Sequence, residues 1–316
     1  MPRCATSSAS VEDAPNAACG RSGTGRSAVN PQVREMRRRA VFLDVDGTYA
    51  NRGWVPPEHV QAVRAARANG HLVLLCTGRA LPALSPELLS AGFDGVVTSA
   101  GAYVLLGERV LADVRFPAPL AERLVRVLQH HGAGFVVESP DALYAGPDVA
   151  DRLQALHRKV GGPASVRRSQ DGPQDLLAGL VLTEDLGTVS FAKVTCFESP
   201  VPLTAIVGEV GQEVAVVPSS IPHLADSAGE LYLAGLTKAH GIELVAAELG
   251  MAAEDVVGVG DGFNDLEMLR YAGVGVAIEG APQEVLAAAD RTTPGPHGRG
   301  VALLFAELGL VGEDRR

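Results

Sequence analysis

The strongest constraint on the fold is a repeated alternation of short apolar runs with helical segments. Apolar runs around 40–44, 72–76 and 95–98 are separated by stretches with helical character. Continuous apolar strands are typical of a parallel sheet covered on both faces, and a strand–helix–strand order requires helical crossovers. The same order returns between residues 238 and 308. The sequence therefore predicts an α/β fold with a Rossmann-like parallel sheet.

A different pattern interrupts this alternation. Between residues 117 and 226, β-branched and aromatic strand-like segments mix with amphipathic helical ones, which indicates an α+β module inserted between two halves of the α/β domain. We expect a core made of residues 40–116 and 227–316 and an inserted α+β cap domain at 117–226. Residues 1–39 are rich in Ala, Ser, Gly and Arg and are predicted to be a disordered tail.

Charge and composition limit the possible partners. The chain has a net charge of −10, while residues 1–39 carry seven arginines and three acidic residues. An acidic body argues against nucleic acid or an anionic membrane as the main partner. No apolar run approaches the ~18 residues of a membrane span. The four cysteines form no CxxC pair, which favours reduced thiols and a cytoplasmic protein. The oligomeric state is not indicated.

Polar residues gather where the predicted core strands end. In an open parallel sheet, ligands bind beyond the carboxyl ends of the strands, so residues from distant stretches can meet there. Four stretches, "DVDGT", "CTGR", "LTKAHG" and "GVGDGFND", contribute Asp44, Asp46, Thr77, Gly78, Lys238, Asp261, Asn264 and Asp265.

These residue types suit phosphoryl transfer. Residues i and i+2 of an extended segment point to one side, so Asp44 and Asp46 can address one substrate. One carboxylate can attack phosphorus and the other can shuttle a proton. Carboxylate oxygens suit Mg²⁺, which offsets their repulsion and lets an anionic ester approach. Thr77 can donate to a phosphoryl oxygen, Gly78 permits close backbone approach and Lys238 adds a positive charge.

Taken in order, the four stretches resemble the motifs of the haloacid-dehalogenase superfamily of phosphohydrolases, and within it the Cof-type subfamily with a large class IIB cap. The DxDGT motif matches residues 44–48, the Thr that ends the next strand matches Thr77, the Lys after the cap matches Lys238, and GDGxND matches residues 260–265. The resemblance spans about residues 40–310, although the cap matches only in size and position.

The resemblance implies a role for each residue. Asp44 would be the nucleophile and Asp46 the general acid and base. Mg²⁺ would be held by Asp44, the backbone carbonyl of Asp46 and Asp261, with Asp265 acting through water or as a minor ligand. The phosphoryl group would be held by Thr77, Lys238 and Asn264, with Gly78 beside them.

We therefore expect a Mg²⁺-dependent phosphatase that hydrolyses a small phosphorylated metabolite, with sugar phosphates as the default class, through an aspartyl-phosphate intermediate. A phosphomutase, or a nucleotide or cofactor phosphatase, on the same core remains open. A non-enzymatic phospho-receiver would share the acids and the lysine, but receivers lack the cap insertion and the second-motif threonine.

Overall fold

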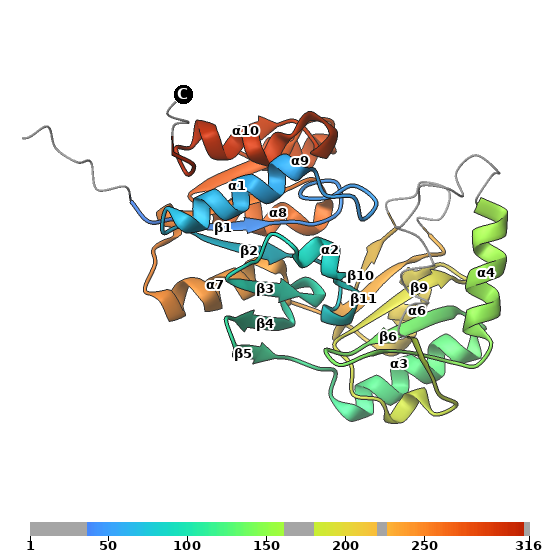
Figure 1. The fold of residues 1–316 in the computed structure, drawn as a ribbon. Helices are drawn as coiled ribbons and strands as arrows, with labels where there is room; N and C mark the ends of the chain where they lie inside the picture. The colour runs from blue at the N-terminus through green and yellow to red at the C-terminus, as the bar shows by residue number, and fades with distance from the viewer. Residues whose placement is uncertain (1–36, 161–179, 220–225, 313–316) are drawn as a thin grey trace, which may run out of the picture. The chain divides into compact units, whose positions relative to one another are not determined.

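The computed structural model of the chain describes residues 37–160, 180–219 and 226–312. All but the last three residues of the expected tail lie outside these ranges, as do Cys4 and Cys19. Within the described residues, the strands form one eight-stranded and one six-stranded sheet (Figure 1). None of the described helices is both long and apolar enough to cross a membrane.

The eight-stranded sheet contains the predicted parallel core. Its strands from one edge to the other are β14 (Arg291–Thr293), β13 (Val274–Ile278), β12 (Val256–Gly260), β1 (Ala40–Leu43), β2 (Leu72–Cys76), β3 (Gly95–Thr98), β4 (Tyr103–Leu106) and β5 (Arg109–Asp113). The pairs from β14 to β3 are parallel, which confirms the α/β prediction. The sheet is not parallel throughout, because the β4–β5 hairpin pairs antiparallel at its edge.

Helices cover both faces of this sheet. The helices are α1 (Pro57–Ala68), α2 (Pro86–Leu89), α7 (Lys238–Leu249), α8 (Leu266–Tyr271), α9 (Gln283–Ala288) and α10 (Gly300–Glu307). Alternate residues of the central strands point to opposite faces: Val41 and Leu43 pack with α1 and α10, whereas Ala40 and Phe42 pack with α7 and α8. Figure 1 shows α1 and α10 on the side of the sheet opposite α7. Burial on both faces explains why these strands are continuously apolar.

The six-stranded sheet belongs to the inserted segment. Its order is β10 (Val214–Pro218), β11 (Gly229–Leu233), β9 (Lys193–Glu198), β6 (Gly134–Glu138), β7 (Leu143–Ala145) and β8 (Leu180–Leu182). The inserted segment also contains α3 (Ala118–His130), α4 (Val149–Val160) and α6 (Leu203–Val210). Short 3₁₀ helices occupy Leu81–Ala83, Ser99–Gly101, Leu186–Thr188, Ala253–Asp255, Phe263–Asp265 and Pro296–Gly298.

Strand pairing moves one expected boundary. The cap was expected to end at residue 226, but β11 pairs with both β9 and β10 in the six-stranded sheet. The second sheet therefore continues to Leu233, and the chain returns to the core sheet through α7. The physical reason is that β11 lies between two strands of that sheet and completes their hydrogen bonding. As a division into domains, the core-and-cap assignment otherwise stays a prediction.

Two helix-interior glycines test the packing. A methyl group at Gly241 in α7 would lie 2.5 Å from Val97 Cγ1 of β3, whereas one at Gly208 in α6 meets nothing within 4 Å. We expect Gly241→Ala to lower the free energy of unfolding by about 1–3 kcal/mol through overpacking. Gly208→Ala should instead raise it by up to about 1 kcal/mol, because alanine is the better helix former. Urea titration of both variants measures this, and equal stability of the two would contradict the packing of α7 on β3.

Candidate active site

The core sheet brings three of the four predicted stretches to one edge. Strand β1 lies between β12 and β2, and Asp44, Thr77 and Asp261 directly follow β1, β2 and β12. The amide of Asp44 donates to the carbonyl of Val259, which continues the β1–β12 ladder by one residue. The positions of these residues therefore follow from neighbouring parallel strands that end within one residue of one another.

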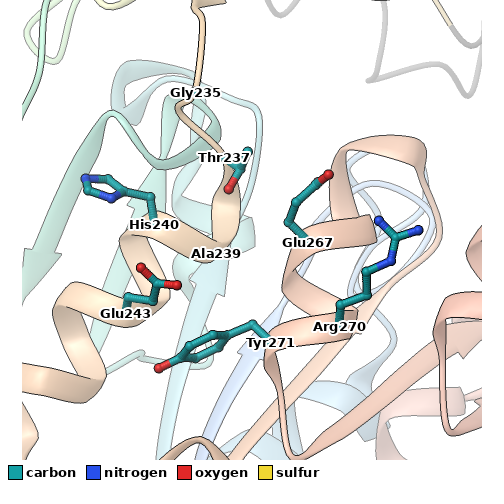
Figure 2. Close-up of a pocket in the computed structure, with 8 residues that line it drawn as sticks. All are labelled: Gly235, Thr237, Ala239, His240, Glu243, Glu267, Arg270 and Tyr271. Carbon is teal, nitrogen blue, oxygen red and sulfur yellow. The ribbon is translucent and has the colours of Figure 1, made fainter.

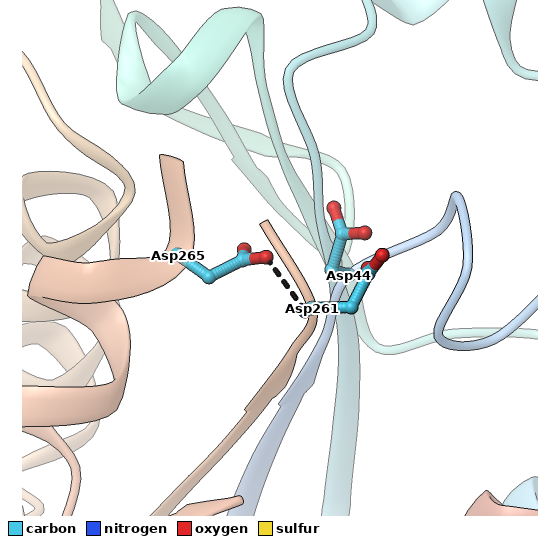
Figure 3. A group of neighbouring side chains, drawn as sticks. All are labelled: Asp44, Asp261 and Asp265. Atoms are coloured by element: carbon cyan, nitrogen blue, oxygen red, sulfur yellow. Dashed lines mark hydrogen bonds between the residues drawn. The ribbon is translucent and has the colours of Figure 1, made fainter. Parts of the chain in front are cut away.

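Three carboxylates converge at this edge (Figure 3). One side-chain oxygen from each of Asp44, Asp261 and Asp265 lies within 4.8 Å of the other two. Asp265 accepts two backbone hydrogen bonds through Oδ2, from Asp261 N at 3.0 Å and from Gly262 N at 2.8 Å. Asp265 thus fixes the turn after β12 and holds Asp261 beside Asp44.

Lys238 is the cation of the group. It is the first residue of α7 and is fully buried, with Nζ 2.5 Å from Asp44 Oδ1 and 2.5 Å from Asp265 Oδ1. Burial alone would lower the pKa of Lys238, but attraction to Asp265 and Asp44 outweighs burial and raises it. Lys238 stays charged and neutralises part of the acidic group.

Burial and repulsion raise the pKa values of two acids of the group. Burial raises the pKa of Asp44 well above its usual value, and Lys238 opposes that shift. Burial, followed by the charge of Asp265, raises the pKa of Asp261 to about 6. Thr48 Oγ1 donates to Asp261 Oδ1 at 3.0 Å, but Asp261 forms no ion pair within the described part of the chain.

The donor set fits a divalent cation. With all three carboxylates ionised and Lys238 protonated, the group carries a net charge of −2. All its candidate ligands are carboxylate oxygens, which suit Mg²⁺ and similar hard cations. Gly47 has a φ of +86°, and a methyl group there would collide with the Asp261 carboxylate, so the loop after β1 needs glycine to approach this site.

The side chain of Asp46 has other neighbours. Strand β1 ends at Leu43 and the chain then turns, with Tyr49 N donating to Asp44 O, so the extended geometry assumed for residues 44–46 is not maintained. Asp46 is half exposed and forms a two-point ion pair with Arg79, at 2.6 and 2.7 Å. Its carboxylate does not belong to the group of three acids.

The other predicted residues lie around the acids. Thr77 is buried, and its Oγ1 accepts a hydrogen bond from Arg79 N at 3.1 Å. Asn264 lies beside Gly78, since a methyl group at Gly78 would be 3.4 Å from Asn264 Nδ2. Lys238 was expected to bind the phosphoryl group, and its direct partners in the structure are carboxylates.

Sequence reasoning missed two contacts. Arg79 follows the Thr-Gly pair in "CTGR", and its position one residue beyond the predicted site was the available signal. Thr48 closes the DxDGT motif and holds Asp261. Neither residue could be assigned a partner from the sequence alone, because the partners of Arg79 and Thr48 lie 33 and 213 residues away.

A surface pocket of about 470 Å³ lies between the start of α7 and α8 (Figure 2). His240 and Glu243 come from α7, and Glu267 and Arg270 from α8. None of the predicted site residues lines it, so this pocket does not mark the acidic group.

Comparison with known proteins identifies the class of molecule. The sequence model of the family described as haloacid dehalogenase-like hydrolase matches residues 41–305. The match covers most of the chain, so the chain belongs to the haloacid dehalogenase-like hydrolase family. This confirms the superfamily expected from the four motifs.

Relatives cover nearly the whole core and insertion. A Bacillus subtilis (strain 168) protein named "Putative phosphatase YkrA" is 26% identical over 281 residues, covering 87% of this chain and 100% of the relative. A solved subclass IIB sugar phosphatase of the superfamily is 21% identical with a TM-score of 0.69, covering 86% of this chain and 100% of that one. A phosphatase from Bacteroides thetaiotaomicron is 19% identical with a TM-score of 0.70, covering 90% and 100%. At these identities, the two structures support the fold.

The raised pKa of Asp261 predicts that the affinity for Mg²⁺ depends on pH. A protonated carboxylate is a poor ligand, so Mg²⁺ binding should weaken as the pH falls through about 6, where Asp261 takes up its proton. We expect binding at pH 5 to be about tenfold weaker than at pH 7.5, measured by isothermal titration calorimetry.

A matched pair of variants locates the ligand. Asp261→Asn should weaken Mg²⁺ binding at pH 7.5 by at least about tenfold. Asp46→Asn should change it little, because only the unaltered backbone carbonyl of Asp46 is an expected ligand. Equal loss in the two variants, or no pH dependence in the unaltered protein, would contradict this metal site.

Proposed function

We propose that this protein is a Mg²⁺-dependent phosphatase that hydrolyses a small phosphorylated metabolite, with sugar phosphates as the leading class, through an aspartyl-phosphate on Asp44. The observation that supports this most is the position of Asp44. Its Oδ1 is anchored by Lys238, while the same carboxylate lies within a group of acids that suits a divalent cation. The name of the Bacillus subtilis relative and the subclass IIB sugar phosphatase structure support the same reaction class.

Asp44 is the nucleophile in this proposal. The Lys238 ammonium fixes one carboxylate oxygen and favours the ionised form of Asp44 against burial, which leaves the other oxygen to attack phosphorus. A divalent cation at the three acids would neutralise charge so that an anionic ester can approach an anionic nucleophile. Thr77, Gly78, Lys238 and Asn264 would hold the phosphoryl oxygens.

Asp46 moves the proton. In the first step, the Asp44–phosphorus bond forms, the ester P–O bond breaks, and Asp46 gives a proton to the leaving alkoxide. In the second step, Asp46 takes a proton from water, the water oxygen attacks phosphorus, and the aspartyl bond breaks to release inorganic phosphate. The two-point ion pair with Arg79 orients Asp46 in its ionised form, so Asp46 takes up a proton from solvent before the first cycle and regains one from water in each second step. The net reaction consumes one water per ester.

Net release of phosphate separates hydrolysis from the phosphomutase reaction, which returns the phosphoryl group to a sugar. A panel of sugar, nucleotide and cofactor phosphates, ranked by kcat/KM, would place the substrate among these classes.

Cytoplasmic localisation stays a prediction.

Replacing the nucleophile tests the proposal. Asp44→Asn should reduce kcat for p-nitrophenyl phosphate by at least about 10³-fold, because an amide cannot form the acyl phosphate. Glu307→Gln is a matched acid-to-amide control on the exposed Arg291–Glu307 ion pair and should retain full activity. Circular dichroism should show both variants folded. Substantial turnover by folded Asp44→Asn would rule out Asp44 as the nucleophile.

A further inference from the structure

A buried ionic cluster lies on three neighbouring strands of the six-stranded sheet. Glu138 ends β6, Lys193 begins β9 and Glu230 lies on β11. Lys193 and Glu138 are almost completely buried, with side-chain exposures of 2% and 3%, whereas Glu230 is 29% exposed. Lys193 Nζ lies 2.6 Å from Glu230 Oε1 and 3.3 Å from Glu138 Oε2. Such a cluster is costly to bury and has no part in the reaction described above.

Lys193 connects the cluster to the predicted phosphoryl-binding loop. Its Nζ donates to the backbone carbonyl of Gly78 at 2.7 Å. Nζ also donates to Glu230 Oε1, and Glu138 Oε2 lies 3.3 Å from the same ammonium. Three protein groups thus surround the Lys193 ammonium, and its effect is to position Glu230 and the loop.

Glu230 presents its second oxygen to the predicted site. A methyl group at Gly78 would lie 3.1 Å from Glu230 Oε2 and 3.4 Å from Asn264 Nδ2, so these two side chains flank the same face of Gly78. Glu230 Oε2 accepts no hydrogen bond from any residue in the part of the chain that the structure describes, while Oε1 is held by Lys193. A partly exposed acceptor thus lies beside the residues expected to hold the phosphoryl group.

We propose that Glu230, positioned by Lys193, is a specificity-determining residue that contacts the alcohol portion of the substrate. Its carboxylate accepts hydrogen bonds from neutral hydroxyl groups and disfavours an alcohol portion that bears its own carboxylate or a second phosphate. This inference rests on the proposed phosphatase function and adds the class of leaving group: a neutral polyhydroxy alcohol.

Two esters of nearly equal size isolate the effect of charge. 2-Hydroxyethyl phosphate and 2-phosphoglycolate differ in a neutral CH₂OH group against a carboxylate. We expect the unaltered protein to favour 2-hydroxyethyl phosphate in kcat/KM by at least about tenfold, because a carboxylate near Glu230 is repelled. The preference should shrink as KCl is raised, since salt screens that repulsion.

Glu230→Gln removes the charge and nearly preserves the shape. It should reduce the kcat/KM preference for 2-hydroxyethyl phosphate over 2-phosphoglycolate by at least about tenfold. Glu213→Gln is the matched control, because Glu213 is an exposed acid of the inserted segment that pairs with Arg123, and it should leave the ratio unchanged. An equal ratio in Glu230→Gln and the unaltered protein would overturn the proposal.

These measurements distinguish a failure of the proposed phosphatase function from a failure of the proposed role of Glu230. If the unaltered protein releases phosphate from none of these esters, p-nitrophenyl phosphate included, the proposed phosphatase function is ruled out. If Glu230→Gln does not fold, the unaltered protein still decides, because a preference for 2-phosphoglycolate, or a ratio insensitive to KCl, contradicts a carboxylate at this subsite.

Discussion

The ion pairs of Lys238 with Asp44 and Asp265 are the interaction on which the site depends. Three acids within 4.8 Å repel one another, and burial disfavours the charged forms of Asp44 and Asp261. A buried ammonium that touches two of them offsets part of that cost, and removing one partner of such a group generally costs about 3–5 kcal/mol. Lys238 thereby fixes the orientation of Asp44 and leaves Asp261, the acid without an ion pair among the described residues, to a cation from solution.

The parallel sheet makes this contact possible. Asp44 and Lys238 are 194 residues apart, yet one follows β1 and the other begins the helix that packs on the same sheet. Helix α7 can approach closely because Gly241 leaves room for Val97. The turn after β12 then depends on Asp265, whose Oδ2 accepts two backbone amides while its Oδ1 holds Lys238. Asp265 therefore serves the local turn and the charge balance together.

The sequence predicted elements whose pattern is set by burial on both faces. Strands β1, β2, β3 and β12 are fully buried, and continuous apolar runs identify them. Strands β5 and β14 are largely exposed and β14 is only three residues long, so neither had a detectable pattern. The positions of Asp44, Thr77 and Asp261 at one sheet edge could be predicted because strand ends align. The partners of Asp46 and Lys238 could not, since they depend on a turn and on a helix packing that spacing does not specify.

The two ionic groups differ in charge and in what they can attract. The inner group, made of Asp44, Asp261, Asp265 and Lys238, has three acids and one lysine. Its net negative charge suits a cation, which can then attract a phosphoryl group. On the second sheet, one ammonium is shared by two carboxylates, and Glu230 has an oxygen to spare. A phosphate monoester of a neutral alcohol has the complementary polarity, with its negative charge at one end and hydroxyl donors at the other. An ester charged at both ends would bind the inner group but be repelled by Glu230, so in our proposal the inner group supports phosphoryl transfer and Glu230 limits which alcohols are accepted.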